Sequence, residues 1–116
     1  MKYLITFNHT QGAWDGLNDE ERSQHTTWLI DFMADLREEQ EQELVFLGPP
    51  ADTKTVRKLA SGDLEVTDGP AFTGDEFIGG YYIVDVETED DAIEWARRGR
   101  FLVGSNEVRP ILEVSM

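Results

Sequence analysis

The chain has 116 residues, of which 40% are hydrophobic and 29% charged, and its formal net charge is −14. This length fits a single domain over residues 1–116, and the apolar share suits a packed core rather than a disordered chain. So acidic a surface would repel phosphate backbones and anionic lipid heads, which disfavours nucleic-acid binding and membrane-surface binding. There is no cysteine, hence no disulfide framework, and no apolar run approaches the ~20 residues of a membrane span. We therefore expect a soluble, cytoplasmic domain.

The first part of the chain predicts a strand, a long helix and a short second strand. β-Branched and aromatic residues from Lys2 to Asn8 predict the first strand. Asn18 followed by Glu21 is typical of a capped helix start, and we expect this helix to run to about Gln42. Apolar and aromatic residues then recur at steps of three and four and define one buried face: His25, Trp28, Leu29, Phe32, Met33 and Leu36. The apolar stretch 44–47 predicts the second strand.

The middle of the chain predicts a hairpin, a loop and a strong strand. Turn residues and alternation favour two paired strands at about Thr53–Leu59 and Leu64–Thr67. Glycines dominate the following stretch, Asp68–Gly80, which we expect to be a loop. Tyr81–Val86 then predicts a strand.

The last part predicts a short helix and a closing strand. Thr88 can cap a helix that ends before Gly99, and the strand should cover Asn106–Val114, with Pro110 marking an edge or a bulge. With the hairpin set aside, the order is β-α-β followed by β-α-β. This order predicts a ferredoxin-like split βαβ fold of class α+β, in which two helices cover one face of a four-stranded antiparallel sheet.

The predicted strands are apolar on both faces. Tyr3 and Ile5 point one way while Leu4 points the other, and Tyr82 alternates with Tyr81 in the same manner. Two helices cover only one face, so the other would be an exposed apolar patch of a size that monomers rarely tolerate. We expect a homodimer joined through sheet faces, a dimeric α+β barrel. The alternative is that the hairpin folds over this face within one chain.

Four segments resemble the YCII-related, DGPF-domain family: Val66–Pro70, Gly79–Val86, Asp91–Ala96 and Glu107–Ile111. They occur in the family's order and cover most of residues 60–112. The resemblance implies a small dimeric α+β barrel of the ferredoxin-like superfamily, in which most members have no assigned reaction. The chain departs from the motif at Ala71, where the family has phenylalanine.

The resemblance also points to a pair of residues that could carry chemistry, His25 and Asp68. Some proteins similar to this family use a His–Asp pair as acid–base machinery, because a carboxylate fixes the imidazole tautomer and tunes its proton transfer. Two alternatives remain open. His25 could be an ordinary partly buried histidine of the helix stripe, and Asp68 could serve only the Asp-Gly-Pro turn.

Arg109 and Tyr82 are the candidate substrate-binding residues. An arginine between apolar strand neighbours either pairs with an acid such as Asp68 or faces a pocket that holds an anionic or carbonyl ligand. We expect His25, Asp68 and Arg109 to line one pocket with Tyr82 as a wall, and His9 could line it too, although loop histidines are commonly solvated. With two histidines and no ligand spacing, no metal and no cofactor are expected.

Three functions fit these residues, and whether the protein is an enzyme stays open. The first is a cofactor-independent lyase- or hydrolase-type catalyst that acts on a small molecule. The second is a non-catalytic module for ligand binding or dimerisation. The third is a protein-interaction module that uses its acidic faces.

Overall fold

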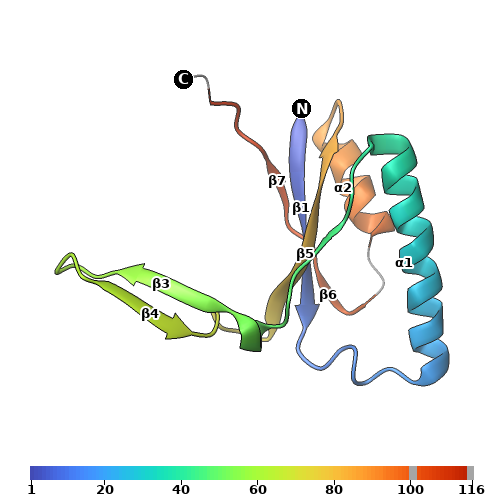
Figure 1. Cartoon of the computed structure of the whole chain (residues 1–116). Coiled ribbons are helices and arrows are strands. Elements are labelled where there is room, and N and C mark those ends of the chain that lie inside the picture. Colours follow the sequence, from blue (N-terminus) through green and yellow to red (C-terminus); the bar gives the residue numbers. More distant parts are fainter. Residues whose placement is uncertain (100–101, 115–116) are drawn as a thin grey trace.

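The structure is a computed structural model that describes residues 1–99 and 102–114 (Figure 1). Its elements are β1 (Lys2–Thr10), α1 (Asp19–Gln40), β2 (Val45–Phe46), the 3-10 helix η1 (Pro50–Asp52), β3 (Lys54–Lys58), β4 (Leu64–Asp68), β5 (Glu76–Asp85), α2 (Glu89–Arg98), β6 (Gly104–Ser105) and β7 (Val108–Pro110).

The strands form one main sheet and one separate hairpin. In the main sheet the order is β2-β5-β1-β6, β7 also pairs with β1, and every pairing is antiparallel. Both helices lie on one side of this sheet, whereas the β3–β4 hairpin projects from the other side (Figure 1). The predicted ferredoxin-like α+β arrangement with an inserted hairpin is therefore confirmed.

The strand boundaries differ most from the sequence prediction in β5 and near the end of the chain. β5 begins at Glu76 rather than Tyr81, because its first residues pair with His9 and Thr10 at the end of β1. The predicted closing strand over Asn106–Val114 is instead two short strands, β6 and β7. At the break, the Asn106 side chain donates a 2.8 Å hydrogen bond to the Thr6 carbonyl. This bond replaces the backbone hydrogen bond that the Thr6 carbonyl would accept in a continuous antiparallel strand pair.

The helix starts follow the predicted caps. The Asn18 side chain accepts a 2.8 Å hydrogen bond from the Glu21 backbone, and the Glu21 carboxylate accepts one of 3.0 Å from the Asn18 backbone. This reciprocal pair satisfies two N–H groups that have no partner within the helix. α1 ends at Gln40, slightly before the predicted Gln42, because Glu41 adopts a left-handed conformation with φ of 56°.

The core lies between the helices and one sheet face. Phe32 of α1 is 3% exposed and contacts the rings of Phe7, Tyr82 and Trp95 edge-on, at centroid distances of 6.2, 5.3 and 6.1 Å. Each such side chain contributes about 1.5–3 kcal/mol when it leaves water. Val86 also packs against this core.

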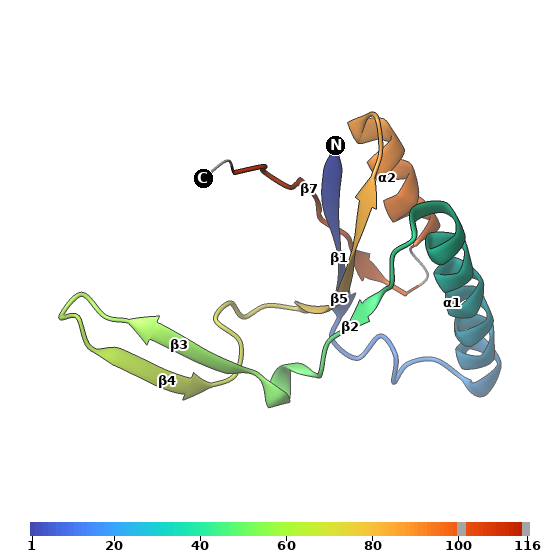
Figure 2. The same cartoon turned by 45° about the horizontal axis from the view of Figure 1, so that its top comes forward.

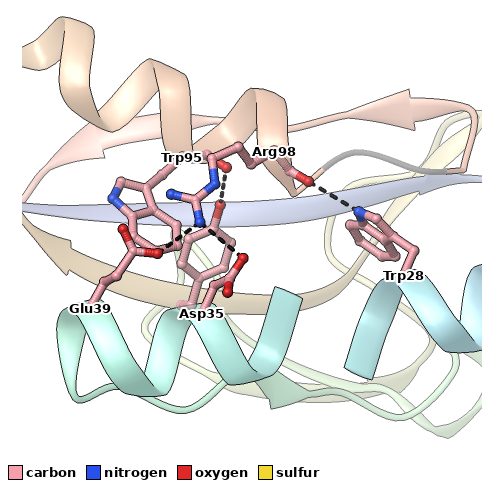
Figure 3. Close-up of polar contacts among 6 residues, drawn as sticks. Trp28, Asp35, Glu39, Trp95 and Arg98 are labelled. Atoms are coloured by element: carbon pink, nitrogen blue, oxygen red, sulfur yellow. Dashed lines mark hydrogen bonds and ion pairs between the residues drawn. The ribbon is translucent and has the colours of Figure 1, made fainter. Parts of the chain in front are cut away.

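Arg98 links the two helices (Figure 3). Its guanidinium donates hydrogen bonds of 3.1 Å to Asp35 and 2.9 Å to Glu39 of α1, and it lies 4.1 Å from the centre of the Trp95 ring. Hydrogen bonding to Glu39 raises the pKa of Arg98 further above its usual value. The Arg98 carbonyl accepts a 3.1 Å hydrogen bond from the Trp28 indole. The C-terminal end of α2 is thus held at two points along α1.

A β-bulge interrupts the pairing of β1 with β5. Phe7 lies opposite Gly80 and Asn8 lies opposite Ile78, so Gly79 is an extra residue on β5. Because of the bulge, the alternation of β5 side chains between the two sheet faces is shifted by one residue here. Phe77 joins Tyr82 on the helix side, and Ile78 lies on the side away from the helices.

The hydroxyl of Tyr82 gives a test of the core. It donates a 3.1 Å hydrogen bond to the Trp95 carbonyl, and Tyr82 is only 1% exposed. Tyr82→Phe should therefore lower the free energy of unfolding by about 1 kcal/mol in urea titrations, since the Trp95 carbonyl would keep only the hydrogen bond from the Gly99 N–H. The control is Tyr81→Phe on the opposite face, which should stay within about 0.5 kcal/mol of the native chain. Equal losses in both variants would contradict this role.

Candidate functional site

A small cavity between the sheet and α1 contains both histidines of the chain, and we call it the histidine pocket. Its volume is about 50 Å³. His9 and His25 lie in a mostly apolar lining that includes Phe7, Trp28, Leu44 and Phe46. The pocket lies where the bulge of β5 leaves two consecutive glycines, Gly79 and Gly80, facing the helix side.

His25 enters the pocket from the predicted apolar stripe of α1. Its ring lies 5.3 Å from that of Trp14, edge-on at 73°, and 5.5 Å from that of Trp28. Burial lowers the pKa of His25 below its ordinary value of 6.5. The neutral imidazole, which can accept a proton, is therefore the dominant form at neutral pH.

The loop before α1 places Trp14 beside His25. Arg22 of the first helical turns lies 5.3 Å from the centre of the Trp14 ring, a cation–π contact, and donates a 3.2 Å hydrogen bond to the Trp14 carbonyl. These contacts fix a loop residue that local propensity leaves undefined. In the sequence, the one sign that Trp14 could belong to the site is that it is an aromatic residue in a loop.

His9 enters the pocket from β1, on the same side of the strand as Phe7. Its ring stacks on Phe7 at 6.2 Å and meets Phe77 edge-on at 5.8 Å. Gly79 makes this position possible, because a Cβ there would lie 2.2 Å from the His9 ring. The two histidines therefore share one pocket, as the sequence suggested for His9.

Asp68 lies far from this pocket in the same chain. It ends β4, where its carboxylate forms an ion pair with Lys54 and its side chain is 85% exposed. The next residue, Gly69, has φ of 95°, and its backbone N–H donates a 2.8 Å hydrogen bond to the Thr53 carbonyl. Asp68 thus lies at the base of the hairpin, at the end opposite the turn that joins β3 and β4. The expected contact between His25 and Asp68 does not form within one chain, because the hairpin projects from the sheet side opposite His25.

Arg109 and Tyr82 also lie outside the histidine pocket. Arg109 is paired with Leu4 and lies on the sheet side away from the helices, where it lines a trough of about 1170 Å³ between the hairpin and the sheet. With the residues that the structure describes, Arg109 forms no ion pair. Tyr82 is buried next to Phe7, with 5.4 Å between the ring centres, and so supports the pocket wall from beneath.

Neither a metal centre nor a membrane span is found in the part of the chain that the structure describes. Over residues 1–99 and 102–114, no three His, Cys, Asp or Glu side chains form a group that could hold a metal ion. Within the same residues, no helix is long and apolar enough to cross a membrane.

The fold and the pocket define a class of small ferredoxin-like α+β proteins with an aromatic, histidine-lined cavity between sheet and helix. The chain belongs to the YCII-related domain family, whose sequence profile matches residues 1–115. A comparison with curated proteins gives no significant match.

The contact between Gly79 and His9 gives a test of the pocket geometry. In Gly79→Ala the added methyl group would overlap the His9 ring, so the ring must move. We expect the His9 ring resonances to shift in ¹H–¹³C NMR spectra while the fold is retained. Gly74→Ala is the matched control, because no atom lies within 4 Å of the added Cβ there. Unchanged His9 resonances in Gly79→Ala would contradict the geometry.

Proposed function

We propose that the protein is a cofactor-independent acid–base catalyst that binds a small molecule in the histidine pocket, with His25 as the proton acceptor. One observation carries this proposal. A histidine whose pKa is lowered by burial faces a cavity with apolar walls. Such an imidazole is neutral at the pH of most cells and can therefore accept a proton from a ligand in the cavity.

The size of the pocket limits what can enter it. A volume of about 50 Å³ exceeds the ~30 Å³ that one water molecule occupies but is well below the ~300 Å³ of a common ligand site. Only the reacting end of a ligand therefore fits in the cavity. The rest of the ligand would lie at the mouth, beside Trp14 and the loop that carries it.

The chemistry that suits this arrangement is abstraction of a proton from a C–H group or from an attacking water, as in lyases and hydrolases. His25 would accept the proton, and His9, which lines the same cavity, could return one to the leaving group. Asp68 has no part in this proposal for a single chain, since its carboxylate pairs with Lys54. Tyr82 would position the pocket wall.

A second function is a binding module that holds the same small molecule without turnover. It is favoured by the position of Asp68, because the carboxylate expected to orient His25 lies on the far side of the sheet. Apolar walls and aromatic contacts suffice for binding, whereas catalysis needs the imidazole to exchange protons with the ligand.

The pH dependence of stability tests the state of His25. Because burial lowers its pKa below 6.5, the unfolded chain binds this proton first as the pH falls. The free energy of unfolding should therefore decrease from pH 6.5 down to the folded pKa. His25→Gln should lack this part of the decrease, while His9→Gln should keep the His25 titration in NMR spectra. Identical pH profiles for the native chain and His25→Gln would contradict the proposal.

Reactivity toward a generic acyl probe separates catalysis from binding. With p-nitrophenyl acetate at neutral pH, His25→Gln should lower the rate of hydrolysis by at least about tenfold if His25 is a general base. His25→Gln together with His9→Gln removes every imidazole of the chain and sets the background rate. A rate that does not change in His25→Gln would favour the binding module.

We also propose that the protein is a homodimer joined through sheet faces. The sheet side away from the helices, here called the open face, is apolar: Leu4, Val45, Leu47, Ile78, Tyr81 and Ile83. Ile78 is 51% exposed, and Val45 is 37% exposed. An uncovered face of this kind is characteristic of association sites rather than of monomer surfaces.

Light scattering after size exclusion checks the dimer. The native chain should have the mass of two 13.2 kDa chains at micromolar concentration. Ile78→Asp on the open face should give single chains, because an unpaired carboxylate would be buried in the interface. Ile30→Asp, a change at a similarly exposed residue of α1, should leave the mass unchanged. A native chain of single mass would refute the dimer.

A further inference from the structure

The β3–β4 hairpin, residues 54–68, which we call the arm, has an apolar face that the described residues of one chain leave largely exposed. Val56 pairs with Val66, and Leu64 lies on the same side of the hairpin, opposite Lys58. These three apolar residues are 63%, 67% and 70% exposed. Over the described part of the chain, β3 and β4 pair only with each other. A lone two-stranded hairpin is marginally stable in water, so the arm needs a surface to pack against.

The shape of the chain indicates how much more surface it exposes than a compact monomer of the same mass. Its radius of gyration is 16.6 Å, whereas a compact chain of this length has about 13 Å. Figure 2 shows the cause, since the arm extends away from the sheet and both helices. The accessible surface of 8248 Å² exceeds the about 6400 Å² of a monomer of this mass by about 1800 Å². One chain of an obligate dimer buries roughly 1000–2500 Å², so this excess is what a dimer interface would remove.

The trough between arm and open face is too large for one small ligand. Its volume of about 1170 Å³ is above the ~300–1000 Å³ of small-molecule pockets. Val56 of the arm forms one wall, Leu47 and Ile78 of the open face form another, and Phe72, which is 91% exposed, also lines the trough. Exposed apolar walls of this size suit a protein surface.

Charge permits the protein surface to be that of a second copy. The arm carries three basic residues, Lys54, Arg57 and Lys58, and three acidic residues, Asp63, Glu65 and Asp68, so its net charge is zero in a chain whose net charge is −14. Contact through the arm therefore avoids the repulsion that opposes association of two strongly acidic chains. Arm and trough lie on the same molecule, so two copies related by a two-fold axis can exchange arms and fill both troughs at once.

We propose that the arm packs against the open face of a second copy and that the two copies exchange arms reciprocally. This inference rests on the proposed homodimer and assigns the arm as the part of each chain that encloses its partner. The apolar face of Val56, Leu64 and Val66 would be buried against the partner's sheet.

A charge on the apolar arm face tests the inference. Val66→Asp should raise the dissociation constant of the dimer at least about 30-fold in sedimentation equilibrium, the effect expected at a well-buried interface position. Ile30→Asp is the matched control, because Ile30 is 61% exposed and Val66 67%. It should change the constant by less than about threefold. Since both side chains are exposed in the single chain, neither change should unfold the protein, which circular dichroism would verify.

Removal of the arm gives a second measurement. The Thr53 carbonyl and the Gly69 N–H are hydrogen bonded at 2.8 Å, so a two-glycine link can replace residues 54–68 without straining the main sheet. This variant should be folded and should dissociate at concentrations where the native chain is dimeric. A native dimer that neither Val66→Asp nor the deletion weakens would overturn the arm exchange and leave the sheet-face dimer standing. A native chain that is monomeric would overturn both.

Discussion

The contact of Phe32 with Tyr82 is the interaction on which the rest of the structure depends. Their rings meet edge-on at 5.3 Å, and this fixes α1 on the sheet. From there a row of aromatic contacts continues along the helix, since Trp28 stacks on Phe32 at 5.7 Å and His25 lies 5.5 Å from Trp28. The histidine of the candidate site is thus connected to the core through two rings. Because packed interiors transmit small displacements, a substitution at Phe32 or Tyr82 should also shift the imidazole of His25.

Charge and apolar surface are divided between the two sides of the sheet. Both helices begin with three consecutive acidic residues, Asp19–Glu21 in α1 and Glu89–Asp91 in α2. These carboxylates stabilise the positive ends of the helix dipoles and make the helix side of the molecule strongly acidic. Of the fifteen exposed large apolar residues in the described part of the chain, seven lie on the open face and the arm. Repulsion therefore opposes association through the helix side and leaves the sheet side as the surface for self-association.

Local sequence patterns predicted the elements well and predicted the site only in part. Caps at Asn18 and Thr88 and the apolar stripe of α1 specify both helices, because they depend on neighbours three and four residues away. His25 belongs to that stripe, so its place beside the sheet could be predicted. The places of Asp68 and Arg109 could not, since they depend on the direction of the hairpin and on the register of β7 with β1. Both are set by pairings between residues far apart in sequence, and no local pattern encodes them.

In a regular strand, the number of residues determines which sheet face each side chain occupies. The bulge at Gly79 removes this dependence at one position. In a regular strand the loss of one residue exchanges the two faces for every residue beyond it. Here Ile78 already lies opposite Asn8 and Phe77 opposite His9, so loss of Gly79 would leave each side chain on its present face. Position 79 is therefore the place where β5 can shorten by one residue and still direct Phe77 toward the His9 ring. Among chains that share this fold, a length difference at this point would alter the twist of the strand and remove one glycine from the pocket wall, while the other side chains of β5 keep their faces.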